Sequence, residues 1–219
     1  EVAIKRNGDN LELIINGTED KLIIRSYFSG AYYYNKNDAS KMVNKVEEIR
    51  FADGTVWDVA YINDAVTSIN GTESNDSLTG YEFDDRINGL GGDDYISAGY
   101  GNDIINAGVG NDKVYGGYGN DIITGGAGDD TIYGEYGNDV IDGGAGNDTL
   151  IGGIASGSNS YNTEGNDTYI FGRGYGVDTI IDVDTTAGNM DVVSMKEDVL
   201  PSEVAIKRNG DNLELIING

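Results

Sequence analysis

The chain has 219 residues, 34 of them glycine, and 38 acidic side chains against 14 basic ones give a formal net charge of -24. It contains neither histidine nor cysteine, which excludes a Ser-His-Asp triad, an HExxH zinc site, thiolate metal ligands and a disulfide framework. The acidic excess repels nucleic acid and anionic membrane surfaces unless a cation bridges them, and no apolar run has the length of a membrane span.

The first 66 residues predict a small β-rich module. Strands are expected at residues 2–6, 11–15 and 21–28, with a hairpin turn at Asn7 and Gly8. A second hairpin is expected from strands at 46–51 and 55–59, joined by a turn at Asp53 and Gly54. Residues 1–66 are therefore interpreted as a flanking or capping module.

Residues 71–151 divide without a gap into nine nonapeptides. Position six is aspartate and position eight a branched aliphatic residue in all nine, while position four is glycine in the last seven. A disordered glycine-rich linker would not keep this register. The period predicts an all-β parallel β-roll, in which each nonapeptide is a six-residue turn and a three-residue strand with position eight facing inward.

Two nonapeptides make one 18-residue coil, so aspartates 18 apart are expected to stack along each edge of the roll. Calcium binds six to eight hard oxygens, which carboxylates and glycine-turn carbonyls supply. The predicted carboxylate ligands are Asp76, Asp85, Asp94, Asp103, Asp112, Asp121, Asp130, Asp139 and Asp148. The predicted backbone ligands are Gly99, Gly101, Gly108, Gly110, Gly117, Gly119, Gly126, Gly128, Gly137, Gly144 and Gly146. Stacked carboxylates repel one another, so we expect folding to require calcium.

Each ion is expected between nonapeptides n and n+2, which allows at most seven shared sites among the nine repeats. Ser74 and Phe83 replace the position-four glycine in the first two repeats, so about five to seven ions are predicted.

After the roll, a tenth nonapeptide begins at Gly152 and is interrupted by a polar loop at about 154–164. The pattern resumes with Asp167 and continues through Asp178, which are added to the predicted ligands. The roll is therefore assigned to residues 67–190.

The sequence EVAIKRNGDNLELIING stands at residues 1–17 and again at 203–219. Either the parent protein carries tandem units or the chain was assembled to imitate one, and residues 191–219 are interpreted as the start of the next tandem module. A hairpin without the rest of its module exposes an apolar face and strand edges, which predicts weak head-to-tail self-association.

Tyr100, Tyr118 and Tyr136 recur 18 residues apart on one edge of the predicted roll. Ring stacking on a repetitive surface explains such a row, and a sugar- or surface-binding strip is the alternative.

The nonapeptide pattern from Gly71 to Asp184 resembles the calcium-binding region of the RTX exoproteins, and VEEIRFADGTVWD at 46–58 resembles the β-rich module that flanks RTX blocks. The resemblance implies a right-handed roll that is exported by a type I secretion machinery and folds on calcium outside the cell, either secreted or at the cell surface. Because the chain has no histidine and its paired carboxylates recur with the periodicity of ligands, a structural module without catalysis of its own is expected. An adhesive repeat of a surface adhesin and the secretion region of a pore-forming toxin are the alternatives.

Overall fold

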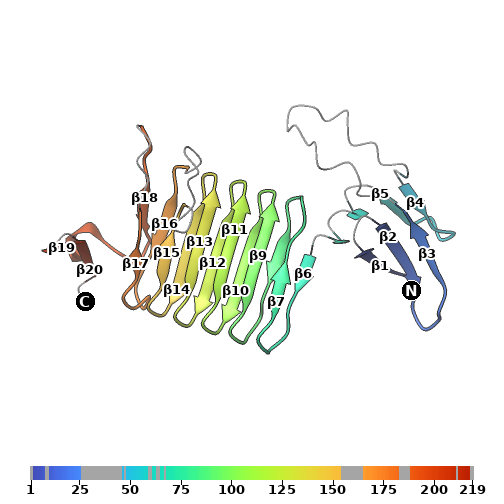
Figure 1. Cartoon of the computed structure of the whole chain (residues 1–219), viewed down its shortest axis with the longest axis horizontal. Helices are drawn as coiled ribbons and strands as arrows, with labels where there is room; N and C mark the ends of the chain where they lie inside the picture. The colour runs from blue at the N-terminus through green and yellow to red at the C-terminus, as the bar shows by residue number, and fades with distance from the viewer. Residues whose placement is uncertain are drawn as a thin grey trace. The chain divides into compact units, whose positions relative to one another are not determined.

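A computed structural model describes residues 2–7, 10–25, 46, 48–58, 61–62, 65–66, 68–153, 165–182, 188–210 and 212–217 (Figure 1). The chain divides into two compact units, Glu1–Ser68 and Ile69–Gly219. In the described part of the chain, no helix combines the length and the apolar character that crossing a bilayer requires.

The first unit contains two small antiparallel sheets. Strands β1 (Val2–Asn7), β2 (Asn10–Ile15) and β3 (Lys21–Ile24) pair in that order, and β4 (Glu48–Arg50) pairs with β5 (Val56–Asp58). Both expected hairpins are confirmed, although the expected turn residue Gly8 and residues 26–28 lie outside the described part. Leu11 is fully buried and Leu13 nearly so, because β2 is the central strand of its sheet.

The second unit is a parallel β-roll made of two sheets, as expected. One sheet has seven strands in the order β18-β16-β14-β12-β10-β8-β6, and the other has six in the order β17-β15-β13-β11-β9-β7. Successive strands along the chain therefore alternate between the two sheets, which Figure 1 shows as two runs of arrows with opposite directions. The strands are β6 (Ser68–Asn70), β7 (Ser77–Thr79), β8 (Arg86–Asn88), β9 (Tyr95–Tyr100), β10 (Ile104–Val109), β11 (Lys113–Tyr118), β12 (Ile122–Ala127), β13 (Thr131–Tyr136), β14 (Val140–Ala145), β15 (Thr149–Ile151), β16 (Thr168–Phe171), β17 (Thr179–Ile180) and β18 (Val192–Met195).

The core of the roll consists of two facing rows of position-eight side chains, one from each sheet, which confirms their inward orientation. Each position-eight residue lies beside the one 18 residues later, as in the pairing of Ile105 with Ile123 and of Ile123 with Ile141. The side chains of both rows are at most 9% exposed: Leu78, Ile87, Ile96, Ile105, Val114, Ile123, Ile132, Ile141, Leu150 and, at the end of one row, Tyr169. Burial of each aliphatic side chain contributes about 1.5 to 3 kcal/mol.

Strands β9 to β14 have six residues each, so the expected three-residue strand is corrected to six. Parallel pairing resumes at positions two and three of the following repeat, for example between Gly108 and Gly126 and between Val109 and Ala127. Glycine at position two makes this continuation feasible because it adopts a positive φ, 119° at Gly108, without strain.

The roll continues past the boundary expected at residue 190. Strand β16 pairs with β14, β17 pairs with β15, and β18 pairs with β16, so residues 192–195 lie in the last coil. The expected loop at 154–164 lies outside the described residues. A short 3-10 helix (Pro201–Glu203) then leads to the antiparallel hairpin of β19 (Val204–Asn209) and β20 (Asn212–Ile217).

Candidate metal centre

Position-six aspartates form two columns, one along each row of turns. The backbone N–H of each aspartate donates to Oδ1 of the aspartate in the next coil, at 2.8 Å for Asp103 to Asp121 and 2.8 Å for Asp112 to Asp130. We define column A as Asp85, Asp103, Asp121, Asp139, Asp167 and Asp191, and column B as Asp76, Asp94, Asp112, Asp130, Asp148 and Asp178. The stacking expected for aspartates 18 residues apart is therefore confirmed.

The inserted residues near the end of the roll do not break either column. Asp139 donates to Asp167 across 28 residues, and Asp148 donates to Asp178 across 30 residues. Asp167 in turn donates to Asp191 across 24 residues. The structure thus places every predicted carboxylate ligand in a column and adds Asp191, which the interrupted spacing concealed in the sequence.

The second carboxylate oxygen of most column members is buried without a hydrogen-bond donor. This Oδ2 atom has no partner in Asp94, Asp103, Asp112, Asp121, Asp130, Asp139, Asp148 and Asp178. A buried carboxylate oxygen that lacks a donor or a cation destabilises a fold, so such atoms are rare. Their regular recurrence in both columns fits a bound cation.

Glycines at position four pack too closely against the preceding coil to admit a side chain. All eleven predicted backbone ligands have a positive φ, between 97° and 153°. A Cβ atom on Gly119 would lie 1.7 Å from the carbonyl oxygen of Gly101 in the preceding coil, and one on Gly128 would lie 2.0 Å from that of Gly110. Successive turns therefore stack with their carbonyl oxygens close to the neighbouring backbone.

This donor set fits calcium. Carboxylate and carbonyl oxygens are the hard ligands that calcium prefers, and it accepts irregular geometry. No three acidic side chains of the described residues converge on one point. An ion between two coils would therefore draw on one or two column aspartates and take its remaining ligands from turn carbonyls and water.

Burial of the columns disfavours ionised carboxylates when no cation is present. Burial raises the pKa of Asp103 and Asp139 to about 8 and that of Asp130 to about 7. Neighbouring column members add to these increases by like-charge repulsion, while the hydrogen bond from the preceding aspartate's N–H lowers each pKa. A divalent cation would offset both the desolvation and the repulsion.

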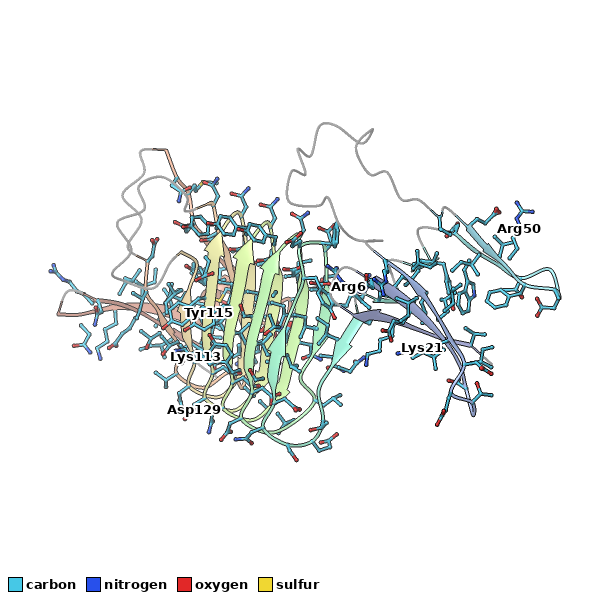
Figure 2. The ribbon with its side chains drawn as sticks, turned by 45° about the vertical axis from the view of Figure 1, so that its right-hand side comes forward. Arg6, Lys21, Arg50, Lys113, Tyr115 and Asp129 are labelled. Atoms are coloured by element: carbon cyan, nitrogen blue, oxygen red, sulfur yellow. The ribbon has the colours of Figure 1, made fainter. Side chains whose placement is uncertain are left out.

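The sequence interpretation missed a second ladder, at position five of the turns. There the side-chain oxygen accepts a hydrogen bond from the position-five N–H one coil later, as Asp93 does from Asn111 and Asp129 does from Asn147, both at 2.8 Å. Figure 2 shows Asp129 at the turn edge of the roll. The signal was present, because position five is asparagine or aspartate in all nine repeats. These exposed side chains hold consecutive turns in register.

The predicted tyrosine strip is a stack of nearly parallel rings. The centroids of Tyr100 and Tyr118 lie 4.8 Å apart, and those of Tyr118 and Tyr136 lie 4.2 Å apart. Tyr115 and Tyr133 stack in the same way at 4.8 Å, with the Lys113 ammonium 5.3 Å from the Tyr115 ring centroid (Figure 2). Because the ring faces contact one another, mainly edges and hydroxyls remain for a ligand, which favours the structural interpretation.

Comparison with protein-family models finds two matches. Residues 10–61 match the haemolysin-type calcium binding protein related domain. Residues 70–105, 79–114, 97–132 and 115–150 match the RTX calcium-binding nonapeptide repeat. A search of curated proteins finds no match.

Proposed function

We propose that residues 69–195 fold on calcium binding and act as a structural module of a large exported protein. The proposal rests on the match to the RTX calcium-binding nonapeptide repeat and on the neighbouring match to the haemolysin-type calcium binding protein related domain. The β-roll is a structural calcium-binding fold, and the chain is a calcium-binding repeat module of an RTX-type protein. The proposal adds that calcium decides whether the roll is folded.

One observation carries this proposal: the buried, unpartnered Oδ2 atoms of the two columns. Each column brings carboxylates together at intervals of one coil, and their mutual repulsion and desolvation oppose folding. Burial of two facing rows of aliphatic side chains, one from each sheet, gives a small core for a unit of this length. A cation bound between coils replaces the repulsion between carboxylates with attraction to the ion, so calcium binding and folding are coupled.

Seven gaps between coils have the same surroundings. In each, a column hydrogen bond joins two aspartates whose repeats both have glycine at position four, including Gly165 and Gly176 after the interruption. We therefore infer up to seven interior ions, at the upper end of the five to seven expected from the sequence.

Calcium-dependent folding suits export. A roll that stays unfolded at low calcium could pass a type I secretion channel and fold outside the cell, where RTX repeat proteins are generally found. We propose that the module has no catalysis of its own, because its acidic groups are engaged in periodic columns. The stacked tyrosines do not favour an adhesive strip, so we propose no second function.

Circular dichroism of the whole chain in calcium, in magnesium and in chelator tests the proposal. We expect β-structure of the roll in calcium alone, with a steep transition at roughly 10⁻⁴ to 10⁻³ M, the range of extracellular calcium modules. Calorimetric titration should count the ions. A roll that keeps the same β-structure in chelator would overturn the proposal.

A further inference from the structure

The C-terminal hairpin repeats a strand pairing that the first unit also contains. Strands β2 and β20 both have the sequence NLELII, and each pairs with the strand before it in the same register, as Ile14 with Ala3 and Ile216 with Ala205. In the first unit, β2 has a second neighbour, β3, on its other edge. In the described part of the chain, β20 pairs with β19 alone. The equivalent edge of β20 therefore has no strand beside it, although the same sequence pairs there in β2.

The direction of the backbone groups identifies the residues that serve this edge. The N–H of Ile15 donates to the carbonyl oxygen of Asp20 at 3.1 Å, on the side of β2 where β3 lies. Because these groups alternate in direction along an antiparallel strand, every second residue of β2 faces β3. The counterparts of these residues in β20 are Leu213, Leu215 and Ile217. Their outward N–H and C=O groups are a template for pairing with another chain.

The side chains of the same residues form an apolar face of the hairpin. Leu213 is 69% exposed, and Ile206, which pairs with Leu215, is 72% exposed. Glu214 and Lys207 lie on the opposite face, where their charged groups are 3.6 Å apart. The hairpin thus combines a strand edge that is open to pairing with an apolar face. Extension of its sheet would place further side chains beside that face.

A second copy of the hairpin fits this edge in one antiparallel register. Registers that place outward-facing residues opposite one another continue the hydrogen-bond ladder. One of them places Glu214 opposite Glu214 of the second copy, and like charges opposite each other destabilise a sheet. The register centred on Leu215 avoids this contact. It places Leu215 opposite itself, Leu213 opposite Ile217 and Glu214 opposite Ile216, whereas a shift in the other direction pairs fewer residues.

We propose that the outer edge of β20 is a self-association surface, through which two copies of this chain join their C-terminal hairpins into one sheet with Leu215 at the two-fold axis. The contact uses the same surface on both copies, so association closes at two copies. The open head-to-tail contact expected from the sequence would instead continue to grow. Exchange of β3 from one copy to β20 of another gains no pairing, because it uncovers the edge of β2 that it leaves.

The joined sheet is more stable than either hairpin, because an isolated two-stranded hairpin is marginal in water and four strands share more hydrogen bonds and apolar contacts. The net charge of -24 on each copy opposes the contact, so added salt should strengthen it by screening. No column aspartate takes part. The inference therefore goes beyond the proposed calcium binding and does not depend on it.

Opposite charges at residue 215 test the two-fold register in the whole chain. Leu215→Lys and Leu215→Glu each place like charges opposite one another, so each variant alone should dimerise about tenfold more weakly than the unmodified chain. An equimolar mixture of the two should recover most of that loss. Leu213→Lys and Leu213→Glu are the matched control, because residue 213 lies opposite Ile217 and their mixture should recover nothing. Sedimentation equilibrium over a concentration series in calcium measures every chain, and circular dichroism checks folding.

The outcomes separate the register, the dimer and the proposed function. A mixture of the Leu215 variants that stays as weak as each variant alone would overturn the two-fold register, as would equal recovery in the Leu213 mixture. An unmodified chain that remains monomeric, or whose mass rises beyond two copies, would overturn the dimer. Neither result bears on calcium-dependent folding of the roll, which circular dichroism in calcium and in chelator measures separately.

Discussion

Replacement of Asp121 by alanine tests the shared-ligand columns most directly. Asp121 lies in the middle of column A, where its Oδ1 accepts the N–H of Asp103 at 2.8 Å and its own N–H donates to Asp139 at 2.8 Å. Its Oδ2 is buried without a partner. The substitution therefore removes a carboxylate from two successive gaps and leaves the N–H of Asp103 buried without an acceptor.

The size of the effect follows from these two losses. An unsatisfied buried donor costs about 1 to 3 kcal/mol, and weaker binding of the adjacent ions brings the total to about 4 kcal/mol. A tenfold change in free calcium changes the binding free energy by about 1.4 kcal/mol for each ion. If about seven ions bind in one transition, the same tenfold change alters the folding free energy by about 10 kcal/mol. The calcium midpoint should therefore rise about 2.5-fold.

Asp76→Ala is the matched control at the end of column B. The Asp76 carboxylate accepts from the Thr72 N–H and hydroxyl in an exposed turn, and water can replace it there. We expect a loss of about 0.5 kcal/mol and a midpoint within about 1.1-fold of the unmodified chain. A calcium titration followed by circular dichroism measures both variants. Equal shifts for Asp121→Ala and Asp76→Ala would refute the shared-ligand arrangement.

Three further predictions concern pH, turn packing and the C-terminal hairpin. In chelator, acid should favour the folded roll. Burial raises the pKa of Asp103 and Asp139 to about 8 in the folded state, above the ordinary value of 3.8, so the folded state binds more protons than the unfolded state between pH 4 and 8. The folded state therefore loses stability as pH rises through that window. In calcium the sign should reverse, because metal-bound carboxylates have a depressed pKa. Circular dichroism in chelator at pH 5 and 8 checks the first sign, with any gain of β-structure expected at pH 5, and denaturant titrations in calcium at the same two pH values check the second. Gly119→Ala should destabilise the calcium-loaded roll by more than about 3 kcal/mol, because the added Cβ would meet the backbone of the preceding coil. Gly174→Ala, which has open space around it, should cost about 1 kcal/mol. Thermal melts of both variants in calcium measure the difference. Deletion of residues 204–219 should abolish weak, concentration-dependent association in light scattering; association that survives the deletion, or a strictly monomeric full chain, would contradict this prediction.

The two copies of the EVAIKRNGDNLELIING sequence lie in different surroundings. Leu11 in β2 is fully buried, whereas Leu213, its counterpart in β20, is 69% exposed. Strand β3 pairs with β2, and the sheet of β19 and β20 has two strands. The same seventeen residues therefore present an apolar face wherever the rest of the module is not packed against them. The predicted apolar face of this hairpin is exposed at Leu213, whereas Leu215 and Ile217 in the same strand are half-buried.

The sequence by itself determined the repeating architecture of this protein. A strict period of nine, with an aliphatic at position eight and aspartate at position six, leaves one arrangement in which all the aliphatic residues share a core and all the aspartates lie on turns. The buried column of Ile105, Ile123 and Ile141 and the stacked aspartates follow from it, because residues one coil apart are neighbours in any such roll. The role of these aspartates as calcium ligands stays a prediction.

Tertiary structure decided what happens where the period fails. Asp191 belongs to column A although 24 residues separate it from Asp167, and β18 joins the sheet beside β16, because hydrogen bonding between coils tolerates chain inserted between them. The burial of the orphaned Oδ2 atoms depends on the spacing between coils. A sequence records which residues recur, but only the packed backbone decides which of their atoms face a donor, a neighbouring carbonyl or an unfilled gap.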